Sequence, residues 1–211
     1  LTSLDISAMS GIERNKIGLN GCLKLAQMLA TNEILSYLNA SLCGFPGEGC
    51  SAISKALSKN KGLLYLDISS NRFASVGANN LFSVDNCLGQ LEYLSLAHNG
   101  ITDSVTTSFC RQISLPNNLI TLDLSHNNLS KKFIKSLSTS LQNCPLQNLN
   151  LSHNSLNSEC GECISTMLLE SKSLVSLNLS SNKLYDAGIK HIAKAIRKST
   201  LKSLDLNDTL I

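Results

Sequence analysis

One spacing of leucines recurs along the whole chain and limits what it can fold into. The pattern is L-x-x-L-x-L-x-x-N-x-L, and its successive copies begin 34, 28, 28, 28, 27, 28 and 27 residues apart. Self-similarity at a period of this length is typical of repeat architectures. The first residues of the copies are Leu1, Leu35, Leu63, Leu91, Leu119, Leu146, Leu174 and Leu201.

Each copy changes its apolar period part-way along. Apolar residues first alternate, as in 122–124, and then recur every three or four positions, as in 189–196. A period of two is typical of a strand and one of 3.6 is typical of a helix. We therefore predict one short strand followed by one helix in each unit.

A unit of this size cannot bury its own apolar face, so neighbouring units must stack. Stacking places the strands in one parallel sheet and the helices on the other side, and the wider helices bend the stack. We predict an α/β solenoid, a curved horseshoe segment with the parallel β-sheet on the concave face and α-helices on the convex face. It comprises about seven to eight repeats in a single domain over residues 1–211.

A polar residue marks the corner after each strand. An inward amide there offers a donor and an acceptor to the buried backbone of adjacent units. In the second and last units this place holds Cys43 and Thr209. A glycine often follows six residues later, as Gly77 and Gly188 do, and we expect it to allow a close turn into the helix. The corner asparagines are Asn71, Asn99, Asn127, Asn154 and Asn182.

These units resemble ribonuclease-inhibitor-type leucine-rich repeats. The residues that carry the resemblance include the stretch 174–184, with Gly188, Ile192 and Ile196 completing that unit. The same class occurs in Ran GTPase-activating protein, in the sensing ends of NOD-like immune receptors and in actin-capping-protein linkers. The resemblance covers nearly the whole chain and implies the fold, but the class serves many partners. About six extra residues near 8–14 depart from the pattern, and we expect them to form a loop.

Composition and charge narrow the class of partner. Apolar residues make up 43 % of the chain but aromatics only 4 %, so we expect an aliphatic core. A net charge of +3 lacks the strong excess of lysine and arginine that nucleic-acid binding requires. No apolar run reaches the roughly 18 residues that a membrane span needs. We expect a soluble segment of a longer protein, a monomer unless its apolar repeat ends associate.

The eight cysteines fit a packing role better than disulfide bonds. Cys43 takes the corner position and Cys110 falls on the predicted buried helix face, so both are expected to behave as small apolar residues. The set indicates reduced thiols in an intracellular protein, cytoplasmic or nuclear. Cys160 and Cys163 have the spacing of a metal or redox motif, but no second such pair completes four ligands. We read them as the start of a helix and predict no metal and no cofactor.

Side chains that flank the buried leucines of each strand form columns across the concave face, about 4.8 Å apart. One column places Tyr37, Tyr65 and Tyr93 side by side, and tyrosine is favoured at binding hot spots. Another places three histidines in adjacent units, just before the corner asparagine: His98, His126 and His153.

The charge of these columns indicates the partner. Acids outnumber bases there, with Asp67, Glu92 and Asp123 near the tyrosines, whereas most lysines fall on predicted helices. An acidic, aromatic face suits a ligand with lysine or arginine. We therefore predict a protein–protein interaction module that binds a basic protein or peptide, with a weaker prediction that the histidines make its affinity depend on pH.

Two alternatives stay open. The repeats could belong to a regulatory, GTPase-activating-type protein, or they could be a structural or autoinhibitory arm of a larger receptor or scaffold. We find no phosphate loop, no Ser/His/Asp constellation and no paired carboxylates that single out catalytic residues, so we predict no enzyme activity and no small-molecule substrate.

Overall fold

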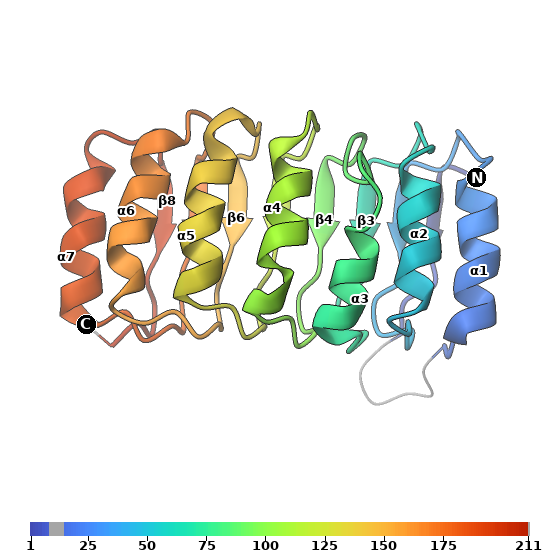
Figure 1. Ribbon diagram of the computed structural model, residues 1–211, viewed down its shortest axis with the longest axis horizontal. Coiled ribbons are helices and arrows are strands. Elements are labelled where there is room, and N and C mark those ends of the chain that lie inside the picture. Colours follow the sequence, from blue (N-terminus) through green and yellow to red (C-terminus); the bar gives the residue numbers. More distant parts are fainter. Residues whose placement is uncertain (9–14, 211) are drawn as a thin grey trace.

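The computed structural model describes residues 1–8 and 15–210 and forms one sheet of eight parallel strands in chain order (Figure 1). The register pairs the same repeat position in every neighbour, for example Leu38 with Leu66 and Leu66 with Leu94. The strands are β1 (Ser3–Asp5), β2 (Tyr37–Asn39), β3 (Tyr65–Asp67), β4 (Tyr93–Ser95), β5 (Thr121–Asp123), β6 (Asn148–Asn150), β7 (Ser176–Asn178) and β8 (Ser203–Asp205).

The helices form a second layer along one face of the sheet (Figure 1). They are α1 (Gly18–Leu29), α2 (Gly49–Leu57), α3 (Ala74–Leu81), α4 (Thr106–Ser114), α5 (Lys131–Ser140), α6 (Cys160–Glu170) and α7 (Tyr185–Ile196), with short 3-10 helices at Asp103–Val105 and Leu141–Asn143. Helix therefore alternates with strand throughout, and the predicted α/β solenoid with its sheet on the concave face is confirmed. Of the loop predicted near 8–14, residues 9–14 lie outside the described part of the chain.

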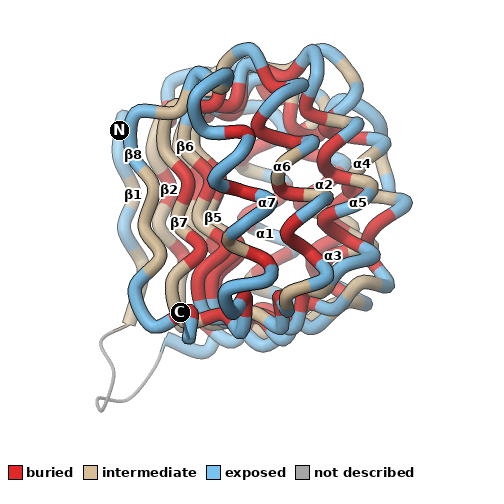
Figure 2. The backbone as a smooth tube through the Cα atoms, turned by 90° about the vertical axis from the view of Figure 1, so that its left-hand side faces the viewer, coloured by how far each residue is buried: buried red, intermediate tan, exposed pale blue. Residues whose placement is uncertain are grey.

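The core fills the space between the two layers (Figure 2). Its inner wall is the central leucine of each strand, and Leu66, Leu94 and Leu122 are fully buried. The expectation of an aliphatic core was incomplete, because all five phenylalanines are buried in it. The ring of Phe109 lies 5.1 Å from that of Phe82 and 5.4 Å from that of Phe133, so aromatic contacts join three successive repeats.

The corner asparagines bind each repeat to the next through their side chains. The Asn127 carbonyl oxygen accepts hydrogen bonds from the backbone N–H groups of Asn99 and Ile101, and its amide donates to three carbonyls, including Leu96 O at 3.1 Å. The two exceptions keep part of this function. The Cys43 thiol donates to Ile6 O at 2.9 Å, and the Thr209 hydroxyl donates to Leu206 O at 2.7 Å.

The glycines after the corner act differently from our expectation. Gly77 and Gly188 lie inside helices, and the left-handed backbone falls three residues earlier, on Ala74 (φ 54°) and Tyr185 (φ 51°). A Cβ on Gly77 would lie 2.6 Å from the Cβ of Phe73. Close packing, and not the turn itself, therefore requires glycine there.

Candidate functional site

Three tyrosines form a stacked column on the concave face, which we call the tyrosine ladder (Tyr37, Tyr65 and Tyr93). They begin β2, β3 and β4, and the parallel register sets them directly opposite one another. The ring centroids of Tyr37 and Tyr65 are 4.2 Å apart at 16°, and those of Tyr65 and Tyr93 are 4.0 Å apart at 7°. Rings this close leave no space for a ligand between them. Only their hydroxyl tips, their edges and the outer faces of the two end rings are open to a partner.

Tyr65 and Tyr93 are held in the neutral form. Burial, together with neighbouring tyrosine and aspartate side chains, raises the pKa of Tyr65. Burial also raises the pKa of Tyr93, and the negative charges of Asp67 and Asp123 add to the shift. The ladder therefore offers hydrogen-bonding hydroxyls and ring edges, and it stands in a negative field.

A shallow hollow begins where the ladder ends. In the next strands the same column continues with smaller residues, so Thr121 follows Tyr93 and leaves a space of about 220 Å³ beside its ring. The lining residues are Tyr93, Thr121, Leu122, Asp123, Asn148, Leu149, Asn150, Ser176 and Asn178.

The histidines form a second stack, which we call the histidine ladder (His98, His126 and His153). Its centroid separations are 3.7 and 3.9 Å, with interplanar angles of 14° and 12°. These residues lie beyond the ends of their strands, at the sheet edge that leads into the helices, and all three have left-handed backbone with φ of 52–55°. They are exposed. The structure therefore brings the three together, but beside the concave sheet and not on it.

The central histidine resists protonation. Partial burial and the positive charges of His98 and His153 lower the pKa of His126, and the charge of Asp123 opposes that shift. Protonating the stack places like charges less than 4 Å apart, which disfavours the charged form.

The aspartates between the leucines have a structural function as well as a charge. One oxygen of Asp67 accepts the N–H of Ser69 at 2.8 Å, and one oxygen of Asp123 accepts the N–H of Ser125 at 2.9 Å. Asparagines make the same bond in β2, β6 and β7. Neither aspartate, nor exposed Glu92 just before β4, forms an ion pair within residues 1–8 and 15–210. Their negative charge therefore remains available to a ligand.

Sequence reasoning missed one base, Arg72. It follows the corner Asn71 and lines a space of about 150 Å³ with Leu42, Ser70 and His98. Arg72 lies one residue beyond the corner, next to the column of repeat positions that holds Leu42, Ser70 and the three histidines. That place in the repeat is the signal by which the sequence could have identified it. Arg72 therefore places one positive charge next to the histidine ladder, while the acidic residues named above lie on or beside the strands.

The chain matches models described as Leucine Rich Repeat at residues 90–112, 118–144 and 145–167, and one described as Leucine Rich repeat at 170–193. It is 32 % identical over 189 residues to NACHT, LRR and PYD domains-containing protein 14 of Mus musculus, which covers 88 % of this chain. It is 35 % identical over 123 residues to ribonuclease inhibitor of Sus scrofa, covering 56 % of this chain. The chain is a leucine-rich-repeat protein of the ribonuclease-inhibitor-like class. It spans only 16 % and 27 % of the length of these two relatives.

Solved structures agree on the fold. The C-terminal domain of tropomodulin from Caenorhabditis elegans superposes with a TM-score of 0.58 at 16 % identity, covering 71 % of this chain and 92 % of that one. Internalin C2 from Listeria monocytogenes also gives 0.58, at 19 % identity, covering 96 % of this chain and 80 % of that one. At these identities the likeness concerns the leucine-rich-repeat fold alone.

The cysteines of these leucine-rich repeats are packing residues. All eight are free thiols, and six are buried. In the Cys160–Cys163 pair, burial raises the pKa of Cys160 to about 11, and Cys163 is half-buried on the first turn of α6. Residues 1–8 and 15–210 contain no cluster of three metal-ligating side chains. Cys110 is only partly buried, so its predicted place in the core was too deep.

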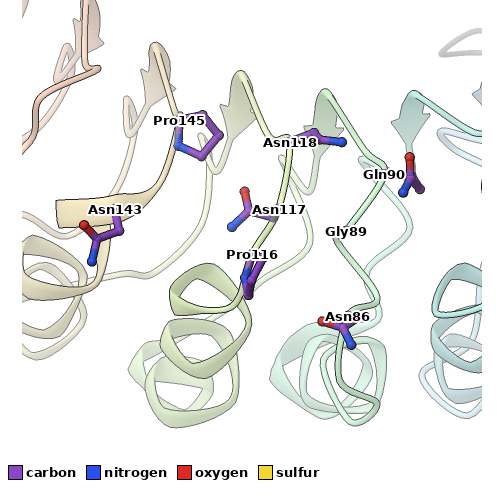
Figure 3. A pocket seen from close by; sticks show the side chains of 8 residues that line it. All are labelled: Asn86, Gly89, Gln90, Pro116, Asn117, Asn118, Asn143 and Pro145. Carbon is purple, nitrogen blue, oxygen red and sulfur yellow. The ribbon is translucent and has the colours of Figure 1, made fainter.

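A larger hollow lies elsewhere, on the loops that lead from helix to strand (Figure 3). It has a volume of about 640 Å³ and is lined by Asn86, Gly89, Gln90, Pro116, Asn117, Asn118, Asn143 and Pro145. The side chain of Asn117 bonds its own loop, donating to Ile113 O and Leu115 O and accepting from Leu119 N–H. The lining has no charged residue to attract a ligand, so we place the candidate site on the concave face.

No helix in the described stretches has both the length and the hydropathy needed to span a bilayer.

Proposed function

We propose that the chain is a protein-interaction module that binds a basic protein or peptide on its concave face, centred on the tyrosine ladder. The observation that carries the proposal is the ladder itself. Three half-buried rings are held parallel at 4.0–4.2 Å by the strand register, so a partner meets a rigid aromatic surface that needs no ordering.

Charge supports a basic partner. Asp67, Glu92 and Asp123 surround the ladder without ion-pair partners among the described residues, whereas the two described ion pairs, Arg111–Asp85 and Lys131–Glu159, involve residues outside the sheet. Complementary charge speeds association and selects partners. The Sus scrofa relative, ribonuclease inhibitor, is by its name an inhibitor of ribonuclease, which is a protein target. The two alternatives, a GTPase-activating-type protein and a structural or autoinhibitory arm, stay predictions.

A displayed library of random peptides, selected on the immobilised chain, tests the proposal without knowledge of the natural partner. We expect selected peptides to be enriched in lysine and arginine relative to the starting library. We expect Tyr65→Ala with Tyr93→Ala to weaken the best peptide by about 30-fold or more, as loss of hot-spot residues does.

The fourth tyrosine gives a matched control. Tyr185 is 46 % exposed and begins α7 on the helix side, so Tyr185→Ala removes an equivalent ring from the convex surface. It should leave peptide affinity unchanged. Two results would show that the assignment to the concave face is wrong: selected peptides without excess positive charge, or an equal loss of peptide affinity in the Tyr65/Tyr93 double variant and in Tyr185→Ala.

A further inference from the structure

We propose that the hollow beside Tyr93 is a subsite for one arginine side chain of the partner. The inference rests on the proposed function and deepens it, because it assigns one chemical group of the partner to one place on the concave face.

The subsite arises where the tyrosine ladder stops. Tyr65 covers one face of the Tyr93 ring at 4.0 Å, and the other face looks along the column toward Thr121 on β5. Thr121 is too small to cover a ring, and the hollow of about 220 Å³ fills the place that a fourth tyrosine would occupy. A flat group bound there continues the stack.

The strand backbone forms the floor of the hollow. Leu122 and Leu149 line it, but their side chains are buried in the core behind the sheet. The Asn148 amide donates to the Thr121 hydroxyl at 3.1 Å, so these two polar side chains partly satisfy each other. The aromatic ring of Tyr93 and the carboxylate of Asp123 are therefore the groups of the lining that can select a ligand.

The charge of the lining selects a cation. Its nine residues include one acid, Asp123, and no base. One oxygen of Asp123 accepts a hydrogen bond from the N–H of Ser125, and the other oxygen has no hydrogen-bond partner among residues 1–8 and 15–210. Asp123 also contributes to raising the pKa of Tyr93, so its negative charge acts on that residue.

Arginine fits this combination better than lysine does. A guanidinium is planar, stacks on an aromatic face and donates paired hydrogen bonds to a carboxylate, whereas an ammonium is a compact, strongly hydrated charge. The Tyr93 face and the Asp123 carboxylate lie on neighbouring strands and line the same hollow. One guanidinium can therefore contact both.

The repeats themselves supply a variant that removes the charge and keeps the fold. Asn39, Asn150 and Asn178 occupy the position of Asp123 in other repeats and accept the same backbone hydrogen bond. Asp123→Asn therefore keeps the turn at the end of β5. Asp205→Asn on β8, which keeps its bond to Asn207 N–H, is the matched control for loss of one charge.

The test uses three small probes of similar size: N-acetyl-arginine amide, N-acetyl-lysine amide and neutral N-acetyl-citrulline amide. Each is titrated into the isotope-labelled chain and followed by amide chemical shifts. We expect the arginine probe to shift the amide signals of Tyr93, Thr121 and Leu122. It should bind about tenfold more tightly than the lysine probe, and its advantage in affinity over the citrulline probe should be larger still. Asp123→Asn and Tyr93→Leu should remove these shifts, and Asp205→Asn and Tyr37→Leu should keep them.

Equal binding of arginine and lysine probes, shifts centred elsewhere, or shifts that survive Asp123→Asn would overturn the subsite. None of these results would affect the selection of basic peptides by the tyrosine ladder, which tests the proposed function separately. If the peptide selection failed but the arginine probe still bound at Tyr93, the subsite would stand and the proposed basic partner would be wrong.

Discussion

The corner asparagines and the tyrosine ladder are both columns built by the same repeat, and they differ in how far their side chains are buried. Asn127 is 5 % exposed, and its carbonyl and amide are satisfied by backbone groups of its own repeat and of the preceding one. Tyr65 is only half-buried and stacks on its two neighbours. The corner side chains thus form their hydrogen bonds inside the fold, whereas the ladder remains free to contact another molecule.

This difference separates scaffold from site. A column that carries the same residue in five units serves a need that every unit shares, which is pairing of buried backbone. A column that carries tyrosine in three strands and small polar residues in the others does something that the fold does not require. Substitutions in the two columns should therefore affect different measurements.

The largest effect is expected at the corner. Asn127→Ala leaves the buried N–H groups of Asn99 and Ile101 without partners and removes one of two hydrogen bonds from each of three carbonyls, so it should lower the free energy of unfolding by about 3 to 5 kcal/mol. Asn127→Cys should cost less, because Cys43 fills this position in the second repeat. Urea unfolding followed by circular dichroism measures both. A loss below about 1 kcal/mol for Asn127→Ala would mean that the column is not the internal support described here.

A smaller effect on stability is expected at the ladder. Tyr65→Ala with Tyr93→Ala removes two stacked contacts on a half-open surface and should lower the free energy of unfolding by about 1 to 2 kcal/mol. The same pair should weaken a selected basic peptide strongly, as proposed above. The two columns would lose their distinction if this variant were destabilised as much as Asn127→Ala.

The smallest effect is expected from the histidine ladder and depends on pH. The pKa of His126 is lowered in the fold, so above about pH 6.5, the unfolded value, the neutral form is present in both states and the stack is undisturbed. As the pH falls below that value the unfolded chain binds the proton more readily, and stability decreases. His126→Asn should reduce this decrease, since asparagine tolerates the left-handed backbone there. Unfolding measured at pH 7.5 and 5.5 checks it, and an identical pH dependence in both proteins would refute it.

Much of the fold is predictable from sequence because every repeat carries the same pattern of leucines. The register of Leu66, Leu94 and Leu122 follows from the leucine spacing, and that spacing also places the tyrosines opposite one another. The inward bonding of the corner asparagines follows from the need of buried backbone for partners.

The finer features depend on geometry that spacing does not contain. Alignment puts three tyrosines in one column, but whether their rings stack or splay depends on side-chain rotamers. The three histidines lie three residues beyond the ends of their strands, in left-handed backbone that the leucine spacing does not specify. The hollow beside Tyr93 appears only when the neighbouring strands are placed together.

The central claim is that a basic ligand binds the concave sheet, and chemical-shift mapping tests it most directly. The best basic peptide from the selection is titrated into the isotope-labelled chain, and amide shifts are assigned along the repeats. The account predicts the largest changes on β2 to β5, around Tyr37, Tyr65, Tyr93 and Asp123. Changes confined to α1–α7, or to the loop hollow around Asn117, would contradict it.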